Sequence, residues 1–204
     1  GFSLTEGIIR SGDEIRNIAV RPQANGIVVT VALAPGRFRE HLARRRNLSG
    51  RTSCGLCGVE TLADLPTAEA RAGTATAITP VAIAAALSAL ERHQPLHRLT
   101  RSVHAAAWCD RDGRILAARE DVGRHNALDK LIGALAKAGI AGATGAVVIT
   151  SRVSVEMVQK AAAIGAPFVV AVSAPTALAV RTADEAGITL VALVRGDEFD
   201  IFTH

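Results

Sequence analysis

Short apolar runs alternate with stretches of helical spacing along this chain, and the alternation is clearest in its second half. The runs are rich in valine, isoleucine and alanine, which is typical of strands buried on both faces of a sheet. Apolar runs of this kind lie at residues 145–150, 168–173, 189–195 and 199–203, and helical patterns lie at residues 127–138, 153–164 and 176–186. The strand–helix–strand order predicts right-handed crossovers and a largely parallel sheet, with the last two strands as an antiparallel edge hairpin.

A β-hairpin and a strong helix are predicted before this region. Two strand patterns, at residues 102–109 and 114–120, flank a turn that ends at Gly113, and glycine suits a turn with positive φ. Thr79 followed by Pro80 is a favourable helix start, and the helical pattern continues to about residue 93.

The first part of the chain has shorter and more polar elements. We expect a helix at residues 1–9, strands at 17–21 and 26–33, a basic helix at 37–46, then a cysteine loop and a polar stretch to residue 78. The sequence therefore predicts an N-terminal portion at residues 1–78, with short strands, basic helix and cysteine loop, and an α/β core at residues 79–204.

The composition supports an α/β protein and limits the classes of partner that it can bind. About half of the residues are apolar, but only 3% are aromatic, so small aliphatic residues must build the core. The net charge of +4 permits an anionic ligand, whereas stacking aromatics are too few for a single-strand binder, so we expect no nucleic-acid partner. We see no signal peptide and no apolar run long enough to span a bilayer, which predicts a cytoplasmic protein without a membrane partner.

The cysteine loop carries the strongest chemical signal. Cys54 and Cys57 are separated by two residues, next to glycines and downstream of several arginines. Cationic neighbours lower a thiol pKa, and the thiolate is the nucleophile, so we predict that this pair handles sulfur. Half of a zinc site, a thioredoxin-like redox pair and two inert buried cysteines remain alternatives. Cys109 ends an apolar strand and is expected to be a structural core residue.

A second motif, at residues 120–130, links a strand to a helix. Asn126 is predicted to cap this helix, and Asp129 to occupy its third position, where a carboxylate meets free N–H groups. Helix capping does not account for the presence of Arg124 and His125 in this motif. We predict that these two residues bind an anion at the helix N-terminus.

Two later strands also end in polar residues that precede a helix. Thr150-Ser151-Arg152 and the segment at residues 173–176 place hydroxyls and a cation before helices, either as ordinary caps or as a cradle for a phosphate-rich ligand. No Walker loop or dinucleotide-binding glycine fingerprint is present. His104 lies on an apolar strand and is expected to be a core histidine unless Asp121 and His125 approach it across the hairpin.

Taken together, these segments resemble the FdhD family, the accessory sulfurtransferases required for formate dehydrogenase activity. The resemblance rests on residues 1–2, 4–9, 53–58, 103–106, 120–130, 151–152, 156–158, 173–176 and 189–203. It implies a fold related to cytidine deaminases, with a mixed sheet between helical layers and a small N-terminal β portion that is truncated here, because members carry further strands before Gly1. Deamination itself is not expected, since the His-x-Glu and Pro-Cys-x-x-Cys signatures are absent.

The resemblance also implies a role and a set of site residues. Members accept sulfur from a cysteine desulfurase as a cysteine persulfide and pass it to the molybdenum cofactor, bis(molybdopterin guanine dinucleotide), before it enters formate dehydrogenase. The persulfide position falls on Cys54, with Cys57 assisting. The guanine dinucleotide contact falls on Leu193, Val194, Arg195, Gly196, Asp197 and Glu198, in addition to our anion-site residues Arg124, His125 and Arg152. A homodimer without a permanent metal is expected, and a non-catalytic chaperone that only holds the cofactor is the alternative.

Overall fold

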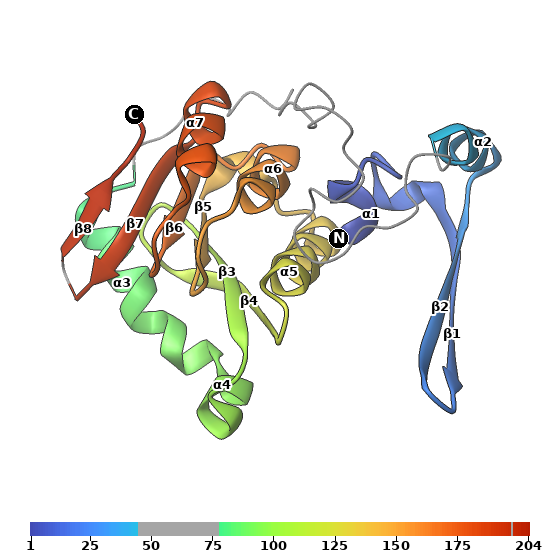
Figure 1. Cartoon of the computed structure of the whole chain (residues 1–204), viewed down its shortest axis with the longest axis horizontal. Coiled ribbons are helices and arrows are strands. Elements are labelled where there is room, and N and C mark those ends of the chain that lie inside the picture. The colour runs from blue at the N-terminus through green and yellow to red at the C-terminus, as the bar shows by residue number, and fades with distance from the viewer. Residues whose placement is uncertain (45–77, 197) are drawn as a thin grey trace. The chain divides into compact units, whose positions relative to one another are not determined.

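The computed structural model describes residues 1–44, 78–196 and 198–204. The chain forms two compact units (Figure 1), one made of Gly1–Thr5 with Pro66–His204 and the other of Glu6–Leu65. The first five residues therefore belong to the larger unit, although the sequence grouped them with the N-terminal portion.

A six-stranded mixed sheet forms the centre of the larger unit, with strand order β4-β3-β5-β6-β7-β8. The strands are β3 (His104–Cys109), β4 (Ile115–Asp121), β5 (Ala146–Ile149), β6 (Phe168–Ala171), β7 (Thr189–Arg195) and β8 (Glu198–Ile201). β5, β6 and β7 are parallel, whereas β4, β3 and β8 run antiparallel to their neighbours. The predicted parallel centre and antiparallel edge hairpin are thus confirmed.

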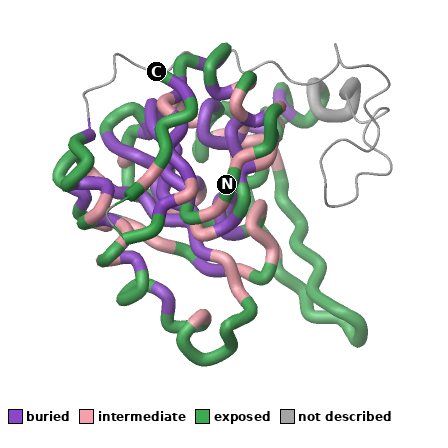
Figure 2. The backbone as a smooth tube through the Cα atoms, turned by 60° about the vertical axis from the view of Figure 1, so that its left-hand side comes forward, coloured by how far each residue is buried: buried purple, intermediate pink, exposed green. Residues whose placement is uncertain are grey.

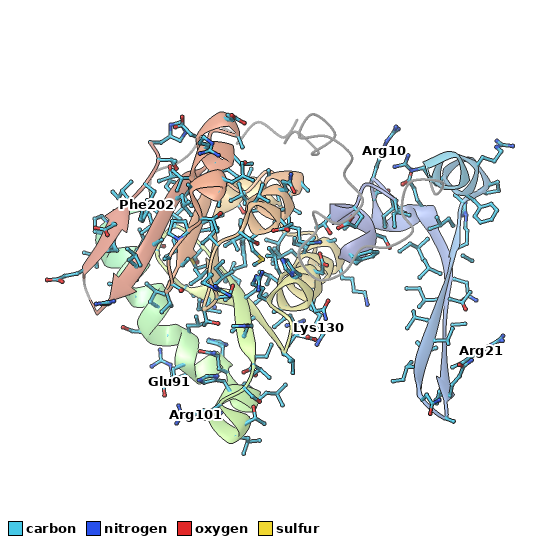
Figure 3. All side chains as sticks on the ribbon, viewed as in Figure 1. Arg10, Arg21, Glu91, Arg101, Lys130 and Phe202 are labelled. Atoms are coloured by element: carbon cyan, nitrogen blue, oxygen red, sulfur yellow. The ribbon has the colours of Figure 1, made fainter. Side chains whose placement is uncertain are left out.

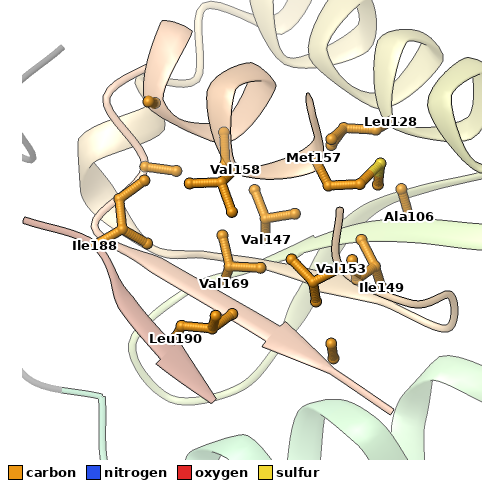
Figure 4. Packing of buried hydrophobic residues seen from close by; sticks show 14 of the residues in the cluster. Ala106, Leu128, Val147, Ile149, Val153, Met157, Val158, Val169, Ile188 and Leu190 are labelled. Carbon is orange, nitrogen blue, oxygen red and sulfur yellow. The ribbon is translucent and has the colours of Figure 1, made fainter. Parts of the chain in front are cut away.

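Helices cover both faces of this sheet, as the α/β pattern predicts. The helices of the unit are α1 (Phe2–Thr5), α3 (Pro80–Leu90), α4 (Pro95–Thr100), α5 (Arg124–Ala138), α6 (Val155–Ala163) and α7 (Ala177–Glu185), with 3-10 turns at Glu91–His93 and Gly142–Thr144. One apolar cluster packs α5, α6 and α7 against one face (Figure 4), and a second packs α3 against the other. The mixed sheet between helical layers is confirmed, and its apolar clusters are built mainly from alanine, valine, leucine and isoleucine.

The start of α5 differs from the prediction. The helix begins at Arg124 with Gly123 as its N-cap, so Asn126 lies inside the first turn and is not the cap. The Asn126 amide instead donates to Asp121 Oδ1 at 3.2 Å. Asp129 consequently falls in the second turn, where it is buried rather than placed at the free N–H groups. The sequence prediction therefore put the start of the helix three residues too late.

The first helix is also shorter than predicted. α1 ends at Thr5, and Gly7 with a φ of 63° adopts the left-handed conformation that stops a helix. Gly1 packs against α5 so closely that a Cβ at this position would overlap the carbonyl oxygen of Asp129. Thr5 Oγ1 donates to Asp129 Oδ1 at 2.8 Å and accepts from Lys160 Nζ at 3.0 Å. The opening residues are therefore bound to α5 and α6.

The smaller unit contains a two-stranded hairpin and a helix. β1 (Ile15–Gln23) pairs with β2 (Gly26–Leu33), a 3-10 turn (Gly12–Glu14) precedes the hairpin, and α2 (Pro35–Arg44) follows it. Arg37 Nε donates to Glu14 Oε2 at 3.0 Å. The hairpin residues are largely exposed, as the colouring of the backbone by burial shows (Figure 2). None of the helices in the described ranges has both the length and the apolar character needed to cross a bilayer.

Candidate ligand-binding site

Several predicted site residues cannot be placed from the structure. Cys54, Cys57 and Asp197 lie outside the described residues. The third cysteine, Cys109, is buried at the end of β3, as predicted, and burial raises the pKa of its thiol to about 11.

A pocket of about 500 Å³ lies at the carboxyl ends of the parallel strands. This is the edge of an α/β sheet at which ligands ordinarily bind. The lining residues come from α3, the α3–α4 connection, α4 and the ends of β5, β6 and β7: Leu87, Ser88, Leu90, Glu91, Gln94, His97, Arg101, Thr150, Val172, Val194 and Gly196. Of the segment expected to contact the guanine dinucleotide, Val194 and Gly196 line the pocket, whereas Leu193, Arg195 and Glu198 do not.

A bulge in β7 turns Val194 towards this pocket. The register between β7 and β8 shifts between Ala192 and Arg195, and Leu193 adopts a left-handed conformation with a φ of 57°. Strict alternation would place Val191 and Leu193 on one face of the sheet. The bulge places Val194 there instead, in the same apolar cluster as Val191. A left-handed leucine is strained, and such strain is found preferentially at functional sites.

The pocket wall that α4 contributes was missed by sequence analysis. Glu120 is buried, and its carboxylate accepts from the backbone N–H groups of Leu96 and His97 at 2.9 and 2.8 Å. This carboxylate therefore caps α4 and fixes the backbone that carries His97 and Arg101. The Pro95 that opens α4 is the sequence signal that could have revealed the helix.

Cationic side chains lie at the same end of the sheet, around His104. Burial lowers the pKa of His104, and the positive charges of Arg124 and Arg152, together with His97, lower it further. Thr150 Oγ1 accepts from the backbone N–H of Ala105, the residue after His104. Because Thr150 and His97 both line the pocket, the predicted anion-site arginines and the pocket adjoin at this strand end.

His125 lies beside these arginines, on the first turn of α5. Its Nε2 lies 4.0 Å from Glu156 Oε2, and burial lowers its pKa, with a further reduction from Arg124. Within the described residues, the buried Arg124 Nε, His125 Nε2 and Ser154 Oγ have no hydrogen-bond partner. Buried polar atoms are nearly always satisfied, so unpartnered donors at the starts of two helices fit a site for an anionic ligand.

Asp121 does not join His104 in an acid–base pair. The strand register places the two residues opposite each other, as the sequence suggested. However, the Asp121 carboxylate binds Lys130 Nζ at 2.6 Å and the backbone N–H of Gly123 at 2.9 Å. These interactions lower the pKa of Asp121. Asp121 thus organises the turn before α5, and the charges that act on His104 are cations.

A loss of stability in mild acid is expected from the two histidines. Their folded-state pKa values lie below the ordinary value of 6.5, so the unfolded chain binds more protons as the pH falls. The stabilisation is complete above the unfolded-state pKa and is lost as the pH falls below that value, about 6.5, towards the lower folded-state pKa. Urea unfolding across this range should show the decline, and His125→Gln should flatten it. The exposed His93→Gln is the control, and an unchanged profile in His125→Gln would contradict the prediction.

No group of three or more His, Cys, Asp or Glu side chains suited to a metal ion occurs among residues 1–44, 78–196 and 198–204. The described site offers cationic and hydrogen-bonding groups, namely arginines, imidazoles with lowered pKa and a threonine hydroxyl, beside an apolar pocket. Groups of this kind are suited to an anionic ligand.

The FdhD/NarQ family model matches residues 1–204, the whole chain. A relative called "Sulfur carrier protein FdhD" from Bordetella parapertussis is 47% identical over 204 residues, covering 100% of this chain and 74% of its own length. A protein of the same name from Agrobacterium fabrum is 50% identical over 205 residues, covering 76% of its length.

A solved structure supports the same relationship. The crystal structure of a putative formate dehydrogenase accessory protein from Desulfotalea psychrophila is similar with a TM-score of 0.72 and 26% identity. The similarity covers 100% of this chain and 74% of that protein. Sequence and fold thus agree along the entire length, and the chain belongs to the FdhD/NarQ family.

Proposed function

We propose that this protein is a sulfur carrier for formate dehydrogenase. In this proposal Cys54 accepts sulfur from a cysteine desulfurase as a persulfide and supplies it to bis(molybdopterin guanine dinucleotide), the substrate, before the cofactor enters the enzyme. The observation that carries the proposal is the family match over the whole chain, with relatives named as sulfur carriers. We place the protein in the cytoplasm, as a homodimer.

The burial and raised pKa of Cys109 support assigning the sulfur-carrying role to the other two cysteines. A thiol with a pKa of about 11 that is 1% exposed contains almost no thiolate at neutral pH. The glycine-rich segment of Cys54 and Cys57, close in sequence to Arg51, has the composition of a reactive loop.

The chemistry balances with thiols alone. The Cys54 thiolate attacks the terminal sulfur of the desulfurase persulfide, the S–S bond of that persulfide breaks, and the desulfurase thiolate leaves. Attack of Cys57 on Cys54 Sγ then forms a Cys54–Cys57 disulfide and releases hydrosulfide to the bound cofactor, where an oxygen ligand leaves as water. The two electrons come from the cysteine pair, which a cellular dithiol must reduce again.

The described site has suitable groups for the cofactor's nucleotide part. The pocket with Val194 and Gly196 would suit a base, and Arg124 and Arg152, whose positive charges act on the neighbouring His104, would suit phosphates. A chaperone that holds the cofactor without moving sulfur would use the same pocket, and sulfur loading of Cys54 distinguishes the two functions.

Intact mass spectrometry after incubation with a cysteine desulfurase and cysteine tests the proposal. We expect a gain of one sulfur atom that reductant removes, that persists in Cys109→Ala, and that is absent in Cys54→Ala. No gain in the wild type, accompanied by stoichiometric zinc, would overturn the proposal in favour of a metal site at the cysteine loop.

A further inference from the structure

The short helix α4 forms one wall of the pocket and also presents an apolar face to solvent. His97 on this helix and Arg101, which follows it, line the pocket. Leu96 and Leu99 of the same helix are 48% and 82% exposed. Residues three positions apart are neighbours on a helix surface, so the two leucines lie side by side. In Figure 1 this helix lies at the lower end of the larger unit, beyond the sheet.

Exposed arginines accompany these leucines. Arg92, Arg98 and Arg101 are all exposed, and within the part of the chain that the structure describes none of the three forms an ion pair. Figure 3 shows Arg101 beside the end of α4. The only acidic residue between positions 91 and 101 is Glu91. The outer side of α4 is therefore both cationic and apolar.

Hydrogen bonds hold both ends of α4 in place. At its start the buried Glu120 carboxylate accepts from the N–H groups of Leu96 and His97. At its end the N–H of Arg101 donates to the carbonyl of His97 at 2.8 Å. The exposure of Leu96 and Leu99 is thus a property of an ordered helix. A surface that is already ordered loses less conformational entropy when a partner binds.

We propose that cofactor-free formate dehydrogenase docks on this side of α4, through an acidic surface with an apolar centre, to receive the cofactor. The inference rests on the proposed function, which makes the enzyme the recipient. The docking residues form what we call the α4 surface: Leu96, Leu99, Arg92, Arg98 and Arg101. The leucines supply the apolar contact, and the arginines attract and orient an acidic partner.

The position of the α4 surface favours the recipient enzyme as its partner. A ligand that passes directly between two proteins leaves through the mouth of its pocket, so the recipient must contact the rim. α4 belongs to that rim, because His97 and Arg101 line the pocket. A second copy of this chain fits less well. A two-fold contact would bring the same three unpaired arginines of each copy together, and like charges across an interface are repelled.

Biolayer interferometry tests the inference, with the full chain immobilised and formate dehydrogenase purified from cells that make no molybdenum cofactor. Leu99→Asp and Arg98→Glu should each weaken binding roughly tenfold or more, because they place negative charge opposite an acidic partner. Wild-type affinity should fall as the salt concentration rises. Matched controls are Val81→Asp, at a 78% exposed position on α3, and Arg181→Glu, on the exposed side of α7. Both controls should bind like the wild type.

The outcomes separate this inference from the proposed function. Undiminished enzyme binding by both α4 variants, equal losses in the two controls, or no binding by the folded wild type would overturn the docking surface. Conversion of a dimer to a monomer by Leu99→Asp in analytical ultracentrifugation, with enzyme binding retained, would assign the leucines to a contact between copies instead. Sulfur loading by a cysteine desulfurase, measured by mass, should be normal in Leu99→Asp. Failure of the wild type to load sulfur would count against the carrier function alone.

Discussion

Formate dehydrogenase activity should fall to the level of a deletion strain when Cys54→Ala is the only copy of this protein in the cell. The proposed persulfide forms on the Cys54 sulfur, and alanine offers no atom to carry it. Alanine is also small and apolar, so we expect normal accumulation of the variant. Enzyme assays on extracts, with immunoblots for the variant and for formate dehydrogenase, measure the result.

Three companion variants make this experiment specific. Cys54→Ser keeps the size and polarity of the side chain and should be equally inactive, whereas a cofactor-holding chaperone would retain much of its function. Cys57→Ala should reduce activity through slower release of sulfur, and Cys109→Ala should remain active because the buried thiol takes no part. Full activity in cells with Cys54→Ala would show that sulfur does not pass through this residue.

Removing Lys160 is expected to cause the largest loss of stability. Lys160 and Asp129 are 7% and 8% exposed, and Lys160 Nζ lies 3.0 and 3.1 Å from the two carboxylate oxygens of Asp129. Lys160→Met would leave a buried carboxylate whose main remaining partner is the Thr5 hydroxyl, at a cost of about 3–5 kcal/mol in the free energy of unfolding. Urea unfolding monitored by circular dichroism would measure this loss.

A double variant separates two contributions to this loss: the missing ion pair itself and the cost of leaving the Asp129 carboxylate buried without Lys160. Asp129→Leu combined with Lys160→Met removes both charges and should recover most of the stability, since apolar replacements of buried ion pairs are often neutral or better. Lys137→Met, an exposed change on α5, should stay within about 0.5 kcal/mol of the wild type. A loss below about 1 kcal/mol in Lys160→Met would show that the carboxylate finds other partners.

Local patterns were enough to predict the order of the strands and α-helices from β3 to β8. The apolar runs at β5, β6 and β7 and the helical spacing between them depend on neighbouring residues only, and the structure contains each element. The burial of Cys109 followed from the same kind of signal, because its strand is apolar along its length. Thr79 and Thr176 cap their helices through side-chain oxygens, a preference that also belongs to the local chain.

The errors came where partners distant in sequence decide the structure. Asp129 at a helix start was a reasonable local interpretation, but the residue pairs with Lys160, 31 positions away. Asn126 is a residue type that often caps helices, but Gly123 is the N-cap of α5, and the Asn126 amide donates to Asp121, five positions earlier. Spacing alone cannot show which of several polar residues finds a buried partner.

The sequence by itself determined the α/β class, the succession of strands and α-helices from β3 to β8, the cysteine pair and the family. Each of these depends on residues that are near one another in the chain or on motifs that can be recognised without geometry. Only the tertiary structure decided the pocket. The β7 bulge turns Val194 inwards, and Glu120 binds the start of α4 from 24 positions away. Gln94, which precedes α4, lines the same pocket. These features depend on register between strands and on long-range hydrogen bonds, which a one-dimensional pattern of apolar and polar residues does not encode.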